Sequence, residues 1–240
     1  MLKTTSLLGA AAVLSACVIV VDGSPDDAVQ VETSYTASQS RTAPDEVLPA
    51  EATLEPFTNI HASSGTNVIV RRGEQHTIRL DDDARRRSTY AVEDGTLEVR
   101  CRQGGSLRTY CLRGDRGTVI VTVPTLEGMR SSSGATLRIE EGFPFAASVT
   151  TSASSGASLS VRGEASVRRL SAQSSSGASL DAQGITADEA TAKASSGASL
   201  RLGMIERRLD AKASSGASIT YRGEPSGDRE ASSGGSVSRR

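Results

Sequence analysis

Residues 154–159 read Ser-Ser-Gly-Ala-Ser-Leu, and close copies of these six letters return through the second half of the chain. The copies begin at residues 132, 175, 195 and 214, and a more divergent one begins at 232. Their glycines lie 22, 21, 20, 19 and 18 residues apart. A repeat with a period near 20 residues is typical of a solenoid in which each repeat forms one coil.

Apolar and small residues alternate around each copy. Across residues 153–161, Ala153, Ser155, Ala157, Leu159 and Val161 are separated only by Ser and Gly. This alternation predicts a half-buried strand with those five side chains inside. The inward serines must then hydrogen-bond, because a buried hydroxyl without a partner costs about 1–3 kcal/mol. The repeated glycine has three explanations at this point: a corner with positive φ, a bulge, or a close approach of another surface.

A chain that re-enters the same strand about every 20 residues, with no helical pattern between, predicts an all-β right-handed parallel β-helix. Like positions should stack, so Leu159, Leu180, Leu200 and Ile219 are expected to form one buried ladder. The falling spacing should either taper the solenoid toward its C-terminus or shorten its loops. We expect shorter loops near residues 162–166, 184–188 and 203–207, because strands gain most when their pairing stays in register. Residues 232–240 should then form a polar cap.

The N-terminal segment predicts export. Residues 1–16 carry one positive charge, a short apolar core and a small-residue exit, which is typical of a secretory signal peptide. Residues 14–17, Leu-Ser-Ala-Cys, resemble a bacterial lipobox, in which Cys17 becomes the lipidated N-terminus. The alternative is a soluble secreted protein with an incidental cysteine. Lipid on Cys17 would hold the protein at a membrane. The residue after this cysteine is Val18 and not Asp, which resembles the sorting pattern of outer-membrane rather than inner-membrane lipoproteins.

Composition and charge set the domain plan. Residues 17–51 are predicted to be a flexible tether and residues 52–240 the folded domain. A formal net charge of -1 argues against nucleic acid as a partner. Asp94-Gly95 predicts a hairpin turn, and residues 118–124 form the most apolar strand. Ser63-Ser64-Gly65 is a distant copy of the repeat, 69 residues before the next, so the early coils should be less regular.

Cys101 and Cys111 flank a Gly-Gly pair and are ten residues apart. Because exported proteins meet oxidising conditions, we expect a disulfide that closes this loop. Two free thiols or a metal pair are the alternatives, and the metal pair lacks a nearby third ligand in the sequence.

Several features together resemble the putative auto-transporter adhesin family with the head GIN domain. They are the start at 57–70, Val-Glu-Asp-Gly-Thr-Leu at 92–97, the strand at 119–124, the Ser-Ser-Gly repeats and the ending Tyr-Arg-Gly-Glu-Pro at 221–225. The resemblance covers residues 52–240 and implies a bacterial cell-envelope protein with a β-helical domain. Family repeats of the form Ala-Ser-Gly-Gly-Ser-Asp end in an acidic residue that this chain lacks.

Candidate catalytic and metal-binding residues are few. His61 and His76 are the two imidazoles, and a catalytic serine would need one of them close by. Residues 81–83, Asp-Asp-Asp, could hold calcium but more simply form a turn or helix start. Residues 85–87, Arg-Arg-Arg, could bind an anionic polymer or balance those aspartates. Residues 113–115 spell Arg-Gly-Asp, an integrin-type tripeptide, but Gly-Asp is also common in ordinary turns. We expect no metal and no cofactor.

Two functions from different classes follow. The first is a non-enzymatic, lipid-anchored envelope module that binds a polymer, glycan or surface protein through flat, Ser-rich faces. The second is a glycan-active lyase or hydrolase on the same scaffold. A cleft with convergent carboxylates would favour the second, because such sites need clustered acidic or basic groups.

Overall fold

The computed structural model describes residues 47–102 and 117–240. In these ranges the chain forms β1 (Glu51–Thr53), β2 (Asn59–Ala62), β3 (Asn67–Arg72), β4 (Thr77–Leu80), α1 (Asp82–Arg87), β5 (Ser88–Glu93), β6 (Thr96–Cys101), β7 (Val119–Val123), β8 (Leu126–Ser131), β9 (Thr136–Ile139), β10 (Phe145–Ala153), β11 (Ser158–Val161), β12 (Ala165–Ser174), β13 (Ser179–Ala182), β14 (Ile185–Ala194), β15 (Ser199–Ala213), β16 (Ser218–Arg222), β17 (Arg229–Ala231) and β18 (Ser236–Arg239). Within this part of the chain no helix has the length and apolarity to cross a membrane.

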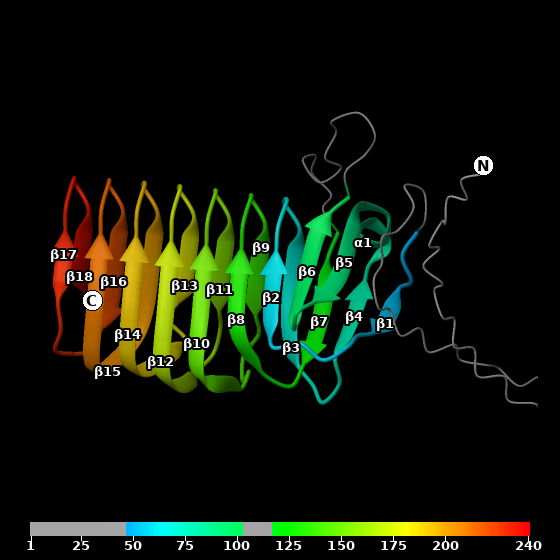
Figure 1. Cartoon of the computed structure of the whole chain (residues 1–240), viewed down its shortest axis with the longest axis horizontal. Coiled ribbons are helices and arrows are strands. Elements are labelled where there is room, and N and C mark those ends of the chain that lie inside the picture. The colour runs from blue at the N-terminus through cyan, green and yellow to red at the C-terminus, as the bar shows by residue number, and fades with distance from the viewer. Residues whose placement is uncertain (1–46, 103–116) are drawn as a thin grey trace, which may run out of the picture. The chain divides into compact units, whose positions relative to one another are not determined.

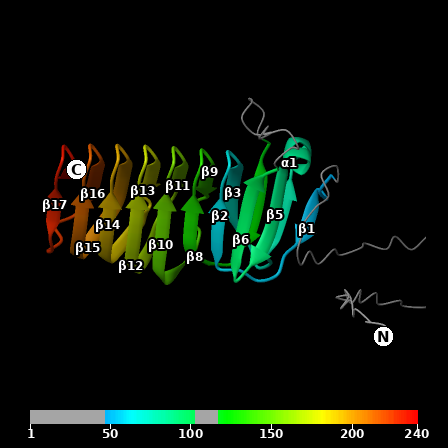
Figure 2. The same ribbon diagram turned by 45° about the horizontal axis from the view of Figure 1, so that its top comes forward.

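The strands stack into two sheets, and each regular coil gives one strand to each (Figures 1 and 2). Sheet B has the order β5-β6-β2-β8-β10-β12-β14-β15-β17. Sheet A has the order β1-β4-β7-β3-β9-β11-β13-β15-β16-β18. Strand β15 contributes to both sheets. Pairing is parallel except at β1, β4 and β5, which confirms the predicted all-β parallel solenoid.

A four-residue turn joins the two strands of each coil, and we call it the Ser-Ser-Gly turn. In the copy at residue 154, Ala157 N–H donates to the Ser154 carbonyl at 3.1 Å, while Ser155 and Gly156 have φ of 53° and 69°. Two successive positive φ angles define a type I′ turn. The same backbone pattern occurs in the turns that begin at residues 63, 132, 175, 195, 214 and 232.

This turn settles the role of the repeated glycine and corrects one prediction. A side chain added at Gly156 would meet nothing within 4 Å, so glycine serves the positive φ and not a close contact. Ser155 is exposed and does not point inward as the alternation predicted. The predicted single strand is therefore two strands joined by a turn.

Successive turns are hydrogen-bonded to one another. Gly156 N–H donates to the Ser176 carbonyl at 3.0 Å, and Gly177 N–H donates to the Ser196 carbonyl at 3.0 Å. The same bond recurs at the neighbouring turns, and the turns line up along one edge of the stack (Figure 1). Each turn thus extends the pairing of the strands around the corner.

We expect Gly177→Ala to destabilise the domain by about 1–2 kcal/mol, because a Cβ opposes the left-handed conformation. Thermal unfolding measures this effect. Ser176→Gly, which relieves the neighbouring positive φ of 53°, should not lower the melting temperature. Equal losses in both variants would contradict the turn assignment.

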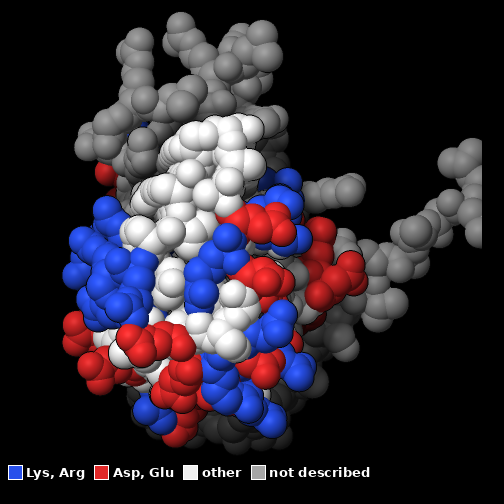
Figure 3. All heavy atoms as spheres, turned by 90° about the vertical axis from the view of Figure 1, so that its left-hand side faces the viewer, with Lys and Arg blue, Asp and Glu red and all other residues white. Residues whose placement is uncertain are grey.

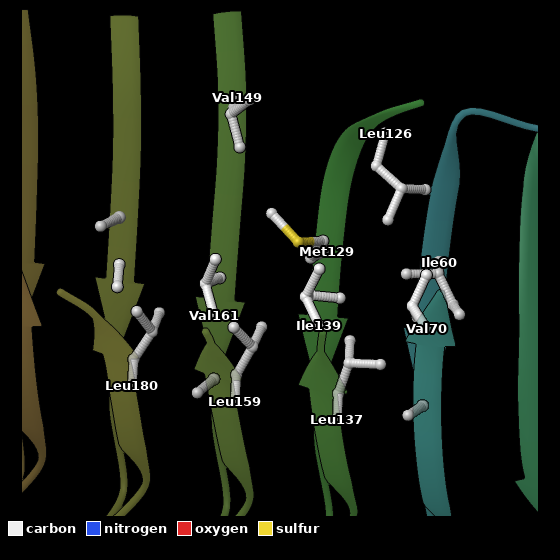
Figure 4. Close-up of a cluster of buried hydrophobic side chains, with 14 of the residues drawn as sticks. Ile60, Val70, Leu126, Met129, Leu137, Ile139, Val149, Leu159, Val161 and Leu180 are labelled. Atoms are coloured by element: carbon white, nitrogen blue, oxygen red, sulfur yellow. The ribbon is translucent and has the colours of Figure 1, made fainter. Parts of the chain in front are cut away.

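The predicted leucine ladder is confirmed. Leu159 pairs with Leu180, Leu180 with Leu200 and Leu200 with Ile219, and all four side chains are buried. Leu137 extends the ladder, and Figure 4 shows Leu137, Leu159 and Leu180 in matching orientations inside the stack. Burial of one such side chain stabilises the fold by about 1.5–3 kcal/mol.

Buried hydroxyls in this core have backbone partners. Ser174 is 2% exposed, and its Oγ donates to the Ala178 carbonyl at 3.1 Å. Ser131 occupies the matching place and donates to the Ala135 carbonyl at 3.0 Å. The expectation that inward serines hydrogen-bond therefore holds for the position just before the turn.

The early coils do not follow sequence order. Strand β2 lies between β6 and β8, and β3 lies between β7 and β9. After β3 the chain forms β4, α1 and β5. It then forms β6 and β7, which pair with one edge of β2 and of β3, and afterwards β8 and β9, which pair with the opposite edges. The turn at residue 63 is therefore beside the turn at 132, although 69 residues separate their glycines. The hairpin at Asp94-Gly95 joins β5 to β6, as predicted.

The falling repeat length comes from the corner opposite the Ser-Ser-Gly turns. Three residues separate β11 from β12, two separate β13 from β14, and β15 continues through the corner without a break. Register is constant between β11 and β13 and between β12 and β14, and it shifts near this corner where β15 pairs with β14 and with β16, so the loss falls at the connections as predicted. Gly203 is buried at this corner. A Cβ added there would lie 2.2 Å from the Ile185 carbonyl oxygen, so no larger residue fits without a shift of the backbone.

The folded part begins slightly before the predicted boundary at residue 52. Leu48 is buried, and its N–H donates to the Arg85 carbonyl at 3.2 Å. At the other end of the stack, β17 is exposed and Val237 in β18 packs partly against the core. The role of residues 232–240 as a cap stays a prediction.

Candidate functional site

The outer face of sheet B carries aligned rows of polar side chains. One row contains His61, Arg130, Ser152, Gln173, Lys193 and Lys212 on successive strands. A second contains Thr150, Ser171, Thr191 and Asp210, and a third contains Ser148, Arg169, Glu189 and Arg208. Parallel pairing places like positions on neighbouring strands about 4.8 Å apart. The outward positions therefore line up along the stack, although the side chains differ from coil to coil.

The second and third rows line a shallow hollow of about 430 Å³, which we call the corner groove. It forms where the strands bend: in β12, Arg168 and Arg169 are both exposed between the buried Val167 and Leu170. Its lining includes small hydroxyl side chains such as Thr191 and long charged side chains such as Arg169.

Ion pairs connect the charged side chains at the corner groove. Arg169 contacts Glu189 at 3.6 Å, and Arg207 contacts Glu189 at 3.2 Å. Arg208 bonds both oxygens of Asp210, at 2.9 and 3.0 Å. The bonds from Arg208 lower the pKa of Asp210, and the Asp228 N–H lowers it further. These groups are exposed, so the pairs orient side chains more than they stabilise the fold.

The two carboxylates of the corner groove lie against arginines. Glu189 and Asp210 both line the corner groove, yet arginines bind each of them. A glycoside hydrolase needs a carboxylic acid that keeps its proton, and its pKa must be raised. The pKa of Asp210 moves the other way. Asp210 therefore lacks the raised pKa that a hydrolase acid needs.

A second hollow, of about 310 Å³, lies between the first row and the Ser-Ser-Gly turns, and we call it the turn groove. Lys193 and Lys212 are neighbours across β14 and β15, and Gln173 precedes them. Lys212 contacts Glu230 at 2.8 Å, whereas Lys193 has no ion pair within residues 47–102 and 117–240. Serines and two alanines make up the rest of the lining: Ser152, Ala153, Ser174, Ser175, Ala194, Ser195 and Ser214.

Charges of both signs intermix over much of the surface seen from the end of the stack at β17, whereas the upper region, where the turns lie, is uncharged (Figure 3). The rows of sheet B thus offer hydroxyl, amide and charged groups in a fixed order. Such a face can form many weak hydrogen bonds with an extended partner.

Other residues singled out in the sequence have structural roles. Asp81 caps α1, because its Oδ1 accepts from Ala84 N–H at 2.8 Å and its Oδ2 accepts from Thr118 N–H at 2.6 Å. Arg85 lies 3.4 Å from Asp82, and Arg86 and Arg87 lie 3.8 and 3.9 Å from Asp83. The prediction of a helix start balanced by arginines is confirmed. No group of three or more potential metal ligands occurs in the described ranges.

The two histidines differ in surroundings. The rings of His76 and Phe57 make a T-shaped contact with 5.0 Å between their centroids, and His76 Nε2 lies 3.1 Å from the Phe57 carbonyl oxygen. His61 lies on the outer face of sheet B, with its Nε2 2.9 Å from Ser132 Oγ. Sequence reasoning missed this contact, because 71 residues separate the two and only the crossing of the chain from β7 to β8 unites them.

The structure does not test the predicted lipid-attachment and disulfide residues. Cys101 is buried at the end of β6. Cys17, Cys111 and the Arg-Gly-Asp tripeptide at 113–115 lie outside the described residues. Lipid on Cys17 and a bond between Cys101 and Cys111 stay predictions.

Comparison with known proteins shows the fold and the family. A putative adhesin from Bacteroides fragilis is similar over 79% of this chain and 95% of its own, with 16% identity and a TM-score of 0.57. A putative lipid binding protein from Parabacteroides distasonis has 14% identity and a TM-score of 0.42, and a putative adhesin from Parabacteroides merdae has 12% and 0.42. These cover 79% of this chain and 95% and 94% of theirs. Curated protein sequences give no match.

The family model described as "Putative auto-transporter adhesin, head GIN domain" matches residues 56–225. That range runs from the residues before β2 to the end of the regular coils. The chain therefore belongs to the head GIN domain family of putative auto-transporter adhesins.

Proposed function

We propose that this chain is a lipid-anchored protein of the bacterial cell envelope that binds an extracellular polymer, glycan or surface protein without turning it over. The outer face of sheet B supports the proposal, because its two grooves each extend across several neighbouring strands and present polar side chains at about the strand spacing, 4.8 Å. An extended partner can contact polar groups on successive coils. The family description as adhesins supports this direction.

An array experiment tests the binding. The chain from residue 18 onward is applied to immobilised glycans, envelope polymers and matrix proteins. We expect retention on at least one extended polymer, with weak contacts adding up over several coils. Absence of retention on every surface would contradict the proposal.

The anchor has a separate test. Cys17→Ala should move the protein from the membrane to the soluble fraction, because the thiol that accepts the lipid is gone. Membrane fractionation with a clickable fatty acid measures both location and lipid. Persistent membrane association of the variant would rule out Cys17 as the attachment site. The proposed location is the outer membrane.

A further inference from the structure

Ser132 differs from the first serine of the other Ser-Ser-Gly turns in having a histidine as its neighbour. The first serine of each turn from residue 132 onward donates its N–H to a carbonyl of the adjacent coil: Ser132 to Ala62 and Ser154 to Ser131, at 2.9 and 3.0 Å. The residue that precedes the accepting residue in the sequence has its side chain on the outer face of sheet B. For Ser132 that residue is His61, and for Ser154 it is Arg130. His61 Nε2 lies 2.9 Å from Ser132 Oγ.

A carboxylate completes the arrangement on the other side of the imidazole. His61 Nδ1 lies 3.8 Å from Glu98 Oε1, and Arg100 binds Glu98 Oε2 at 3.0 Å. A carboxylate facing Nδ1 favours the tautomer with its proton there, which leaves the Nε2 lone pair for the Ser132 hydroxyl. The three groups come from β6, β2 and the turn after β8.

The surroundings of His61 keep its imidazole in the basic form. Burial lowers its pKa below the usual value of 6.5, and the charge of Arg130 lowers it further, whereas Glu98 raises it. A neutral imidazole at pH 7 can accept a proton from a serine hydroxyl. Ser132 and His61 are both only partly buried, so a ligand can reach them from solvent.

We propose that Ser132 is a nucleophile that accepts an acyl group from ester ligands, with His61 as its general base and Glu98 as a positioning residue. Ser132 Oγ forms a bond to the ester carbonyl carbon while its proton passes to His61 Nε2. The tetrahedral intermediate then breaks its bond to the alcohol oxygen, and the alcohol leaves with the proton from His61. The products are an acyl-serine and a free alcohol, and no oxidant or reductant takes part.

This reaction goes beyond non-covalent binding. One acyl transfer to the protein would attach an ester-bearing partner covalently beside the sheet B face. Such an assembly of nucleophile, base and orienting group is recognised by geometry and not by sequence position.

Covalent labelling tests the proposal. The chain from residue 18 onward is treated with a fluorophosphonate and, separately, with p-nitrophenyl acetate, and adducts are located by peptide mass mapping. A general base contributes about 10²-fold or more, so we expect Ser132 to react about 100-fold faster than Ser154. Ser132→Ala and His61→Gln should abolish the fast adduct, and Ser154→Ala should keep it. Equal labelling of the turn serines, or none, would overturn the proposal.

The pH profile tests the roles of His61 and Glu98. Charged groups facing the imidazole are Glu98 and Arg100 from β6 and Arg130 from β8. The labelling rate should fall as pH drops through the pKa of His61. In Glu98→Gln the midpoint should move to lower pH, because Glu98 raises that pKa, and the maximum rate should fall. An unchanged profile in this variant would contradict the role given to Glu98.

Discussion

Leu180→Asp is expected to unfold the C-terminal coils. Leu180 is fully buried between Leu159 and Leu200 on the neighbouring strands. The substitution removes a large apolar group and places an unpaired carboxylate in the core, at a cost of about 5 kcal/mol or more. That is comparable with the whole stability of an ordinary domain, about 5–15 kcal/mol.

Hydrogen exchange measures where this unfolding occurs. Coils of a solenoid contact only their neighbours, so protection should be lost in β12 to β18 and better retained in β2, β6 and β7. Ser179→Asp is the matched control, since Ser179 is the exposed residue before Leu180. A Leu180→Asp protein with an unchanged melting temperature would rule out the register described above.

Gly203→Ala is expected to cost about 3 kcal/mol, at the upper end for overpacking. The added Cβ would lie 2.2 Å from the Ile185 carbonyl oxygen and 2.7 Å from that of Gln183. Both atoms are backbone of the adjacent coil, so relief requires the sheet pairing to shift. Gly203 has no positive φ, and the effect is therefore steric.

Thermal denaturation of Gly203→Ala beside Gly177→Ala separates two uses of glycine. Gly177 has open space around it and a φ of 69°, so its variant should lose less. A Gly203→Ala domain as stable as the wild type would contradict the close corner packing.

Sequence periodicity predicted most of the C-terminal solenoid. The leucine ladder and the shortened connections both follow from repeats that keep the same inward residues. Local signals also predicted the Asp94-Gly95 hairpin and the helix start at Asp81.

Alternation failed at the Ser-Ser-Gly turn for a geometric reason. Ala153 and Ala157 are both inward and an even number of residues apart. The apolar pattern therefore continues in phase across the turn as it would along one strand. A period of two cannot distinguish these cases, so Ser155 was assigned to the wrong side.

The stacking order and the contact between His61 and Ser132 were beyond sequence reasoning. Both depend on β8 pairing with β2 after the chain has formed β4, α1, β5, β6 and β7. Nothing local in the sequence marks that crossing, because the turns that begin at residues 63 and 132 share the letters Ser-Ser-Gly with every other copy.

The central functional claim is that sheet B, and not sheet A, is the binding face. The most direct test measures binding of the wild type, Ser171→Arg and Ser160→Arg to the polymer retained on the array. Ser171 lines the corner groove on β12, and Ser160 is a half-buried outward serine on sheet A. Ser171→Arg should fill the groove and weaken binding at least about tenfold, or about 1.4 kcal/mol, whereas Ser160→Arg should bind like the wild type. Equal binding by all three, or loss only in Ser160→Arg, would contradict the assignment.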